Sequence, residues 1–183
     1  NVVYLDSYPL EKYSMYGAVP LNTIKGKLLQ LKEAGRLDKV KMVILTNCTF
    51  DGLVYNVEKV MSELLAIRPD LVFLWDEAWF AFAAFTNTYK QRTAMFIADR
   101  LLEKFHTEAY KAEYKKQHAQ LAKKQSGEII VPGMPDPAKV KIRVYSTQST
   151  HKTLSSFRQG SMIHVYDEEF EKKTEGNFHE AYM

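Results

Sequence analysis

The sequence predicts an α/β fold in three layers (α/β/α), with helices on both faces of a mostly parallel sheet. Short apolar runs rich in Val and Ile recur along the chain, as is typical of strands that are covered on both faces. Helical patterns separate these runs, so that strand and helix alternate. The predicted strands are residues 2–5, 42–46, 71–75, 142–145 and 162–166.

Two segments between these runs have the end signals of helices. Residues 23–35 follow a helical pattern that stops at Gly35, and residues 56–67 follow another that ends before Arg-Pro-Asp. An alternation of strands and helices gives right-handed crossovers, which gather the carboxyl ends of the strands at one edge of the sheet. We therefore expect the functional site among the polar clusters that follow strands, at 46–52, 76–79 and 146–152.

Residues 87–124 differ from the rest, because their apolar residues form one helical stripe and Lys and Glu share the other faces. We expect one or two solvated helices outside the sheet, away from the chemistry. The alternative is a surface for nucleic acid or an acidic partner, but no stacking platform or binding motif accompanies it. Residues 126–140 contain three prolines and two glycines and predict a loop. We interpret 87–140 as a helical insertion with a Pro/Gly loop, within one domain.

Composition limits the class of protein. The chain has 183 residues, of which 46% are hydrophobic and 26% charged, enough for one domain with a core. The single cysteine, Cys48, excludes an internal disulfide and indicates a cytoplasmic protein. No apolar run predicts a membrane span, and a net charge of +3 is too small to indicate nucleic-acid binding. No pair of His or Cys has the spacing of metal ligands, so no metal site is predicted.

The stretch 144–165 places Lys152 between His151 and Thr153, where the pattern predicts half burial. Because a buried ammonium is costly, the amine either reaches water from a turn or is occupied covalently, for instance as a Schiff base. Taken alone, each polar cluster is better explained by a capped turn. In combination, the strand-end acid Asp76 and a later strand-end lysine beside hydroxyls and a histidine supply what pyridoxal 5'-phosphate (PLP) requires.

Three stretches, 45–60, 71–82 and 146–165, resemble the bacterial ornithine/lysine/arginine decarboxylase family, and Ser-Thr-His-Lys at 149–152 is the most specific part. The resemblance implies that residues 1–183 are part of a PLP-binding large domain of fold type I, like that of aspartate aminotransferase. It also implies decarboxylation of lysine, ornithine or arginine, with release of carbon dioxide and an amine. The small-molecule substrate would be the main partner, and the full protein would form a homodimer or a higher homo-oligomer.

The resemblance assigns the two catalytic roles to Lys152 and Asp76. Lys152 would form the Schiff base with the cofactor, and Asp76 would pair with the pyridine nitrogen. An ionised carboxylate there keeps a proton on the ring nitrogen, which makes the ring withdraw electrons from the substrate.

Four further residues would contact the cofactor by the same resemblance. Ala78 would lie against one face of the ring, and Trp79 would direct its indole N–H at the phenolic oxygen. Ser149 and His151 would contact the phosphate.

Two departures from the family pattern leave the substrate open. The interval between Asp76 and Lys152 is longer than the family usually shows, which we attribute to the insertion at 87–140. Arg158 and Gly160 stand where the family tends to have smaller polar residues and Ala. An aminotransferase or lyase of the same fold is one alternative, and a non-catalytic scaffold or regulatory protein is another. We expect the segment alone to be inactive, because no Gly/Ser-rich loop for the phosphate precedes Asp76.

Overall fold

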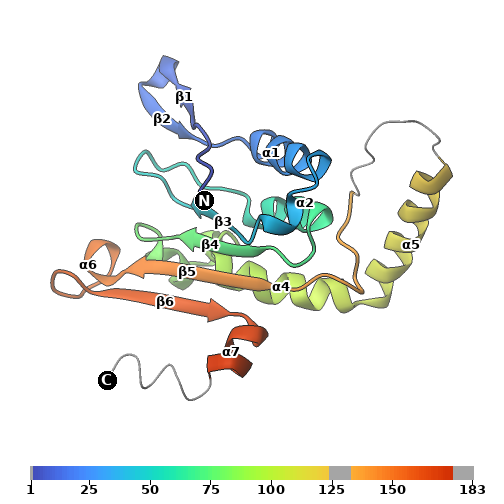
Figure 1. Cartoon of the computed structure of the whole chain (residues 1–183). Helices are drawn as coiled ribbons and strands as arrows, with labels where there is room; N and C mark the ends of the chain where they lie inside the picture. Colours follow the sequence, from blue (N-terminus) through green and yellow to red (C-terminus); the bar gives the residue numbers. More distant parts are fainter. Residues whose placement is uncertain (1, 124–132, 175–183) are drawn as a thin grey trace.

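The computed structural model describes residues 2–123 and 133–174 as an α/β fold around a four-stranded sheet (Figure 1). The sheet has the order β3-β4-β5-β6; β3, β4 and β5 are parallel, and β6 is antiparallel. The predicted α/β class with a mostly parallel sheet is confirmed. The strands are β3 (Met42–Thr46), β4 (Val72–Asp76), β5 (Arg143–Ser149) and β6 (Ser161–Tyr166), and a separate hairpin consists of β1 (Tyr8–Leu10) and β2 (Met15–Ala18).

Helices flank this sheet. They are α1 (Leu21–Glu33), α2 (Val57–Ile67), α3 (Asn87–Lys90), α4 (Ala94–His106), α5 (Glu108–Lys123), α6 (Thr150–Thr153) and α7 (Glu168–Thr174). Within residues 2–123 and 133–174, none of them combines the length and apolarity needed to cross a bilayer.

Each of the two predicted helices has a capping residue at one end. Gly35 adopts a φ of 64°, and the N–H groups of Gly35 and Arg36 donate to the carbonyls of Lys32 and Leu31, which satisfies the free carbonyls at the end of α1. Asn56 caps the start of α2, because its side chain accepts a hydrogen bond from the Lys59 N–H at 3.1 Å.

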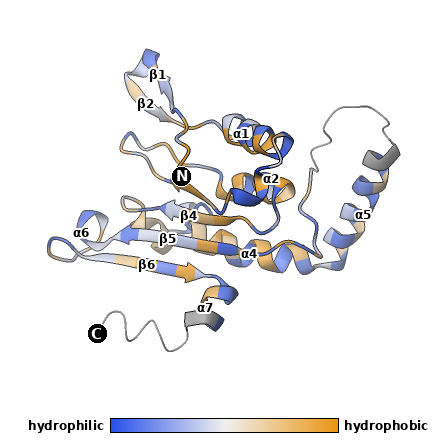
Figure 2. Ribbon diagram, in the orientation of Figure 1, coloured by the Kyte–Doolittle hydropathy of each residue, from blue (hydrophilic) through white to orange (hydrophobic). Residues whose placement is uncertain are grey.

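The hydrophobic core lies between the sheet and helices α1, α2 and α4. The crossovers β3-α2-β4 and β4-α4-β5 advance in the same direction along the sheet, so crossovers of one hand place both helices on one face. Phe73 and Trp75 of β4 point into this core and are almost fully buried. Figure 2 shows hydrophobic residues gathered on α2 and β4, whereas α5 is largely hydrophilic. On the opposite face, Phe170 of α7 packs edge-on against Tyr145 of β5.

The expectation that 87–124 lies wholly outside the sheet is wrong for α4. Ile97, Ala98, Leu101 and Phe105 of α4 are buried in the core, since α4 is the crossover between the parallel strands β4 and β5. Helix α5 agrees better with the expectation, because most of its described side chains are exposed.

Two strand predictions also need correction. Residues 2–5 form no strand: Val2, Val3 and Tyr4 are exposed, and only Leu5 packs against the core. The run at 162–166 does form a strand, β6, but it is antiparallel to its neighbour. The connection from β5, residues 150–160, is too short for the crossover that a parallel partner needs.

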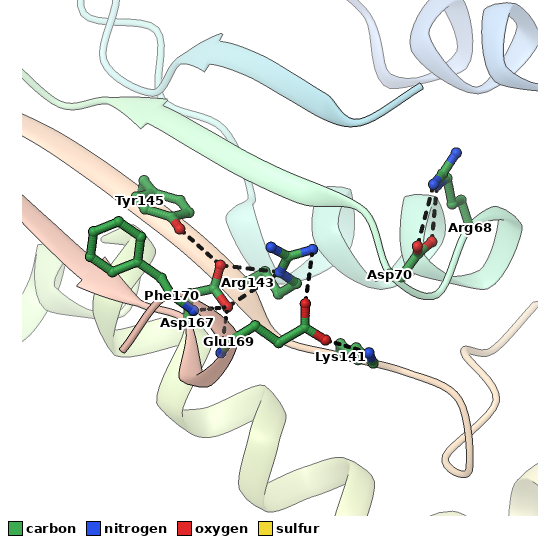
Figure 3. Close-up of polar contacts among 8 residues, drawn as sticks. All are labelled: Arg68, Asp70, Lys141, Arg143, Tyr145, Asp167, Glu169 and Phe170. Carbon is green, nitrogen blue, oxygen red and sulfur yellow. Dashed lines mark hydrogen bonds and ion pairs between the residues drawn. The ribbon is translucent and has the colours of Figure 1, made fainter. Parts of the chain in front are cut away.

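A polar cluster around one buried carboxylate joins β5 to the end of β6 (Figure 3). Its centre is Asp167, whose carboxylate accepts hydrogen bonds from Arg143 Nε at 3.2 and 3.1 Å and from the Tyr145 hydroxyl at 2.8 Å. The same carboxylate caps α7 by accepting from the Glu169 N–H at 3.0 Å. Glu169 in turn forms ion pairs with Lys141 and Arg143. This cluster anchors α7 to the face of the sheet opposite α4.

Candidate active site

The three parallel strands end in one row of polar residues. Thr46 of β3 is paired in register with Asp76 of β4, and Asp76 is paired with Thr147 of β5. The clusters at 46–52, 76–79 and 146–152 therefore meet at the carboxyl edge of the sheet, where open α/β sheets bind ligands.

Asp76 lies at the end of β4 and points away from the hydrophobic core. Trp75 before it and Glu77 after it are fully buried, and the alternation of side chains along a strand puts Asp76 on the opposite, partly exposed face. Its Oδ1 accepts a hydrogen bond from the Ala78 N–H at 3.0 Å and lies 3.5 Å from the Thr147 hydroxyl. The carboxylate is thus oriented by its own turn and by the adjacent strand.

Lys152 lies in the single turn of α6, directly after β5, and its ammonium faces Trp79. Its Nζ is 5.2 Å from the centre of the Trp79 ring, a cation–π contact. Trp79 is 42% exposed and contacts Phe50 edge-to-face, with 6.0 Å between ring centres. The expectation that Lys152 is half buried is wrong for this chain, because α6 projects past the end of the sheet and leaves the lysine exposed.

Ser149 and His151 lie on either side of the start of α6. Ser149 is the last residue of β5 and is 8% exposed, whereas His151 is exposed. His151 Nδ1 lies 2.9 Å from the Gly160 carbonyl oxygen, which also accepts from the Thr150 N–H at 3.0 Å. The loop that returns to β6 therefore fixes both the start of α6 and the orientation of the imidazole.

Position 160 has little room for a side chain, which explains the glycine there. A Cβ at position 160 would lie 2.1 Å from the Thr150 hydroxyl oxygen and 3.0 Å from the Ser156 hydroxyl oxygen. These two hydroxyls are hydrogen-bonded to each other at 2.7 Å. An alanine here would have to displace the Thr150 hydroxyl and break its hydrogen bond with Ser156.

Sequence reasoning missed Glu77, which is fully buried one residue after Asp76. Its Oε1 accepts from Asn47 Nδ2 at 2.7 Å and from the Ala94 N–H at 2.8 Å. Its Oε2 accepts from the Ser146 hydroxyl at 2.8 Å and from Gln148 Nε2 at 3.1 Å. Its position could have indicated this burial, because Glu77 lies two residues after Trp75 and four after Phe73. Side chains at this spacing point to the same face of the sheet, which is the core face.

Cys48 also lies near this edge. Burial, and then the negative charge of Glu77, raise the pKa of its thiol. The thiol therefore stays protonated at neutral pH, and Cys48 is not activated as a nucleophile.

The edge of the sheet therefore presents an accessible amine, a carboxylate from the adjacent strand and an aromatic ring between two chain segments. Lys152, Asp76 and Trp79 supply these groups, and Ser149 and His151 add a hydroxyl and an imidazole beside the amine. Such a set can hold a small cofactor or substrate that carries a carbonyl and an anionic group.

Comparison with known proteins identifies one matching family. Residues 1–122 match the family described as Orn/Lys/Arg decarboxylase, major domain. This range includes Asp76, Ala78 and Trp79 and ends before Lys152. It also includes α4 and most of α5, so whether 87–140 is an insertion within the family stays a prediction.

Individual relatives extend the similarity further. The chain is 31% identical over 173 residues to the lysine decarboxylase LdcA of Pseudomonas aeruginosa, which is 91% of this chain and 18% of that protein. A stretch of that coverage must contain both Asp76 and Lys152.

Two other relatives agree. The chain is 31% identical over 141 residues to a lysine decarboxylase of Hafnia alvei, with 76% of this chain and 13% of that protein covered. It is 27% identical over 163 residues to the biodegradative arginine decarboxylase of Escherichia coli, with 84% and 16% covered. The chain thus spans less than a fifth of the length of these relatives.

Proposed function

Because the chain belongs to the Orn/Lys/Arg decarboxylase family, in the part described as its major domain, we propose that the full-length protein is a PLP-dependent decarboxylase of a basic amino acid. The substrate would be lysine, ornithine or arginine, and the products carbon dioxide and an amine. One observation carries the proposal: Asp76 ends β4, Lys152 lies in the turn that follows the adjacent parallel strand β5, and the Trp79 ring lies beside the lysine ammonium.

The residues at this edge fit PLP in chemistry. An exposed amine can bind an aldehyde carbon, and a partly exposed carboxylate can pair with a protonated ring nitrogen. Ala78 is small enough to let a flat ring approach the backbone, and the Trp79 indole N–H can donate to a phenolic oxygen. Ser149 and His151 can contribute to a phosphate site, and His151 Nε2 stays available because Nδ1 faces the Gly160 carbonyl.

Asp76 and Lys152 have different roles in the proposed reaction. When bound, PLP supplies an electron-withdrawing ring that accommodates the electron pair left on the substrate carbon after carbon dioxide leaves. Asp76 would keep a proton on the ring nitrogen, since its negative charge favours the protonated form. The Ala78 N–H donates to Oδ1 of that carboxylate, and the Thr147 hydroxyl lies 3.5 Å from the same oxygen, so Oδ2 stays available. Lys152 would bind the cofactor through Nζ and present it to the amino acid.

Other parts of the full-length protein would complete the site. We propose that the remaining phosphate contacts come from outside this chain, which spans 18% of the length of LdcA. We also propose that the protein is cytoplasmic, because its single cysteine suits a reducing compartment. The resemblance to the family, whose active sites form at a subunit interface, supports a homodimer or a higher homo-oligomer.

The test uses the full-length protein, incubated with PLP and then reduced with borohydride. Peptide mass spectrometry should locate the cofactor on Lys152, and chromatography should detect amine formed from lysine, ornithine or arginine. Lys152→Ala should abolish both results, whereas Lys116→Ala, which removes an exposed lysine of α5, should leave them unchanged. A label on another lysine would refute the assignment of Lys152. A 2-oxo acid in place of an amine and carbon dioxide would indicate an aminotransferase.

A further inference from the structure

Glu77 is a carboxylate in the protein interior with no exposed surface, held by four hydrogen bonds between 2.7 and 3.1 Å. A buried carboxylate is costly unless its acceptor positions are filled. Here each oxygen accepts two hydrogen bonds, and the four donors are neutral groups. Glu77 is therefore a fully satisfied polar centre within the core face of the sheet.

The orientation of the donors is fixed by their other contacts. The Ala94 N–H can only donate, and it belongs to the first turn of α4, where a helix terminus favours negative charge. Gln148 turns its amide nitrogen to Glu77, because a carboxylate oxygen only accepts, and its amide oxygen then lies 3.1 Å from His164 Nε2. Asn47 Nδ2 donates to Glu77 and also to the Arg92 carbonyl at 2.9 Å.

The donors come from the segments that frame the candidate site. Asn47 follows β3, Ser146 and Gln148 belong to β5, and Ala94 begins the crossover helix α4. Through Gln148 and His164 the network also reaches β6. From the end of β4, this one side chain thus ties together the ends of the two strands that flank β4 and the start of the crossover from β4 to β5.

This network is adjacent to both proposed catalytic residues without containing either. The Asp76 carbonyl accepts from the Asn47 N–H at 2.9 Å, and the Glu77 N–H donates to the Thr147 carbonyl at 2.8 Å. The peptide that carries Asp76 is therefore held from both neighbouring strands. Gln148 lies only one residue before the end of β5, which leads directly into the turn with Lys152.

We propose that Glu77 is a positioning residue that fixes the Asp76 carboxylate relative to the Lys152 amine from the opposite face of the sheet. The inference rests on the proposed function for the roles of those two residues. Glu77 itself cannot touch a cofactor or substrate, because it is fully buried on the core face. Its effect must pass through the backbone at 76–78 and the end of β5.

The central test is Glu77→Gln in the full-length protein, with Glu113→Gln as control. The glutamine keeps the shape of Glu77 but turns an NH2 group toward the donors Ser146 and Gln148. Glu113 lies exposed on α5, so its variant makes the same chemical change away from the network. A double variant, Glu77→Gln with Gln148→Glu, returns an acceptor to the pair and should recover most of the loss.

Two measurements are made on each variant. Hydrogen exchange of the protein without PLP should rise about tenfold or more at 76–79 and 147–152 in Glu77→Gln, with little change in α1 and α5. Titration with PLP should show affinity weakened by about 10- to 100-fold, the range typical when a group supporting a binding residue is lost. If Glu77→Gln does not fold, Ser146→Ala removes a single donor and should give the same local pattern with a smaller rise.

Three results would decide against the inference or its premise. Exchange and PLP affinity within twofold of the Glu113→Gln control would overturn the positioning role. An equal rise in exchange throughout the domain would overturn it too, because that pattern reports a general loss of stability. A wild type that never carries PLP on Lys152 would reject the proposed function, while the exchange comparison would still decide whether Glu77 holds the two segments.

Discussion

Replacing Asp167 should loosen β6 and α7 far more than replacing a comparable surface aspartate. Asp167 and Asp70 each pair with an arginine, as Figure 3 shows, but the Asp167 side chain has no exposed surface and that of Asp70 is 51% exposed. Asp167→Ala and Asp70→Ala therefore remove the same carboxylate from a fully buried and from a half-exposed position, each beside an arginine.

The size of the effect follows from the interactions that the Asp167 carboxylate makes. Loss of the α7 cap costs about 1 kcal/mol, and loss of the hydrogen bond from the Tyr145 hydroxyl costs about 1 kcal/mol. Breaking a fully buried ion pair costs about 3–5 kcal/mol. Here the cost is smaller, on the order of 1 kcal/mol, since the Arg143 side chain is 24% exposed and also pairs with Glu169. We expect about 3 kcal/mol for Asp167→Ala and about 0.5 kcal/mol for Asp70→Ala.

Native-state hydrogen exchange on the full-length protein measures the local loss of stability at β6 and α7. A decrease of about 3 kcal/mol in the free energy of opening corresponds to exchange about 100-fold faster at the amides of β6 and α7. Asp167→Asn keeps one acceptor for the helix cap and should fall between the wild type and Asp167→Ala. Equal exchange in the Asp167→Ala and Asp70→Ala variants would refute the reasoning, since it would mean that burial adds nothing to the pair.

Three further predictions concern the site and its support. If the proposed function holds, Asp76→Asn in the full-length protein should still allow PLP to be fixed on Lys152 by borohydride, but kcat should fall by about 100-fold or more; near wild-type turnover would contradict the role of the charge. Burial, and then the Asp167 carboxylate, raise the pKa of Tyr145 to about 12, so its neutral form is favoured in the folded state. The stability that Tyr145 contributes through this shift is fully present below about pH 10 and is lost as the pH rises toward 12. Tyr145→Phe should therefore flatten the decline of the free energy of unfolding between these pH values, and an unchanged slope against pH would exclude Tyr145 as a cause. Helix α4 should exchange its amides as slowly as β4 and more slowly than α5; equal rates in the two helices would contradict the burial of α4.

The parts of the fold that the sequence predicted well are those decided by local chemistry. The run at 42–46 has the same bounds as β3, and the predicted stop at Gly35 follows the last turn of α1 because a left-handed backbone acts within a few residues. The hairpin β1–β2 has weaker local signals. The left-handed residue before β2 is Ser14, at a φ of 52°, where a glycine would have indicated a turn.

The errors concern properties that depend on distant parts of the chain. The apolar run at 162–166 predicts a strand but contains nothing that specifies its direction, which the short connection from β5 determines. The amphipathic pattern of α4 predicts a helix with one apolar face. It does not distinguish a solvated helix from a crossover whose polar face meets water, and the pairing of β4 with β5 decides between them.

The candidate site shows the same division between local and long-range information. Asp76 and Lys152 are recognisable because each follows an apolar run, and their residue types match a known chemistry. Glu77 follows the same run as Asp76, yet its burial requires donors from β3, β5 and α4, which lie up to 71 positions away in sequence. A carboxylate placed one residue past a buried strand, on its core face, predicts only that such donors must exist somewhere. Their identity depends on strand order, which turns an ordinary acidic residue into the polar centre that links the two proposed catalytic segments.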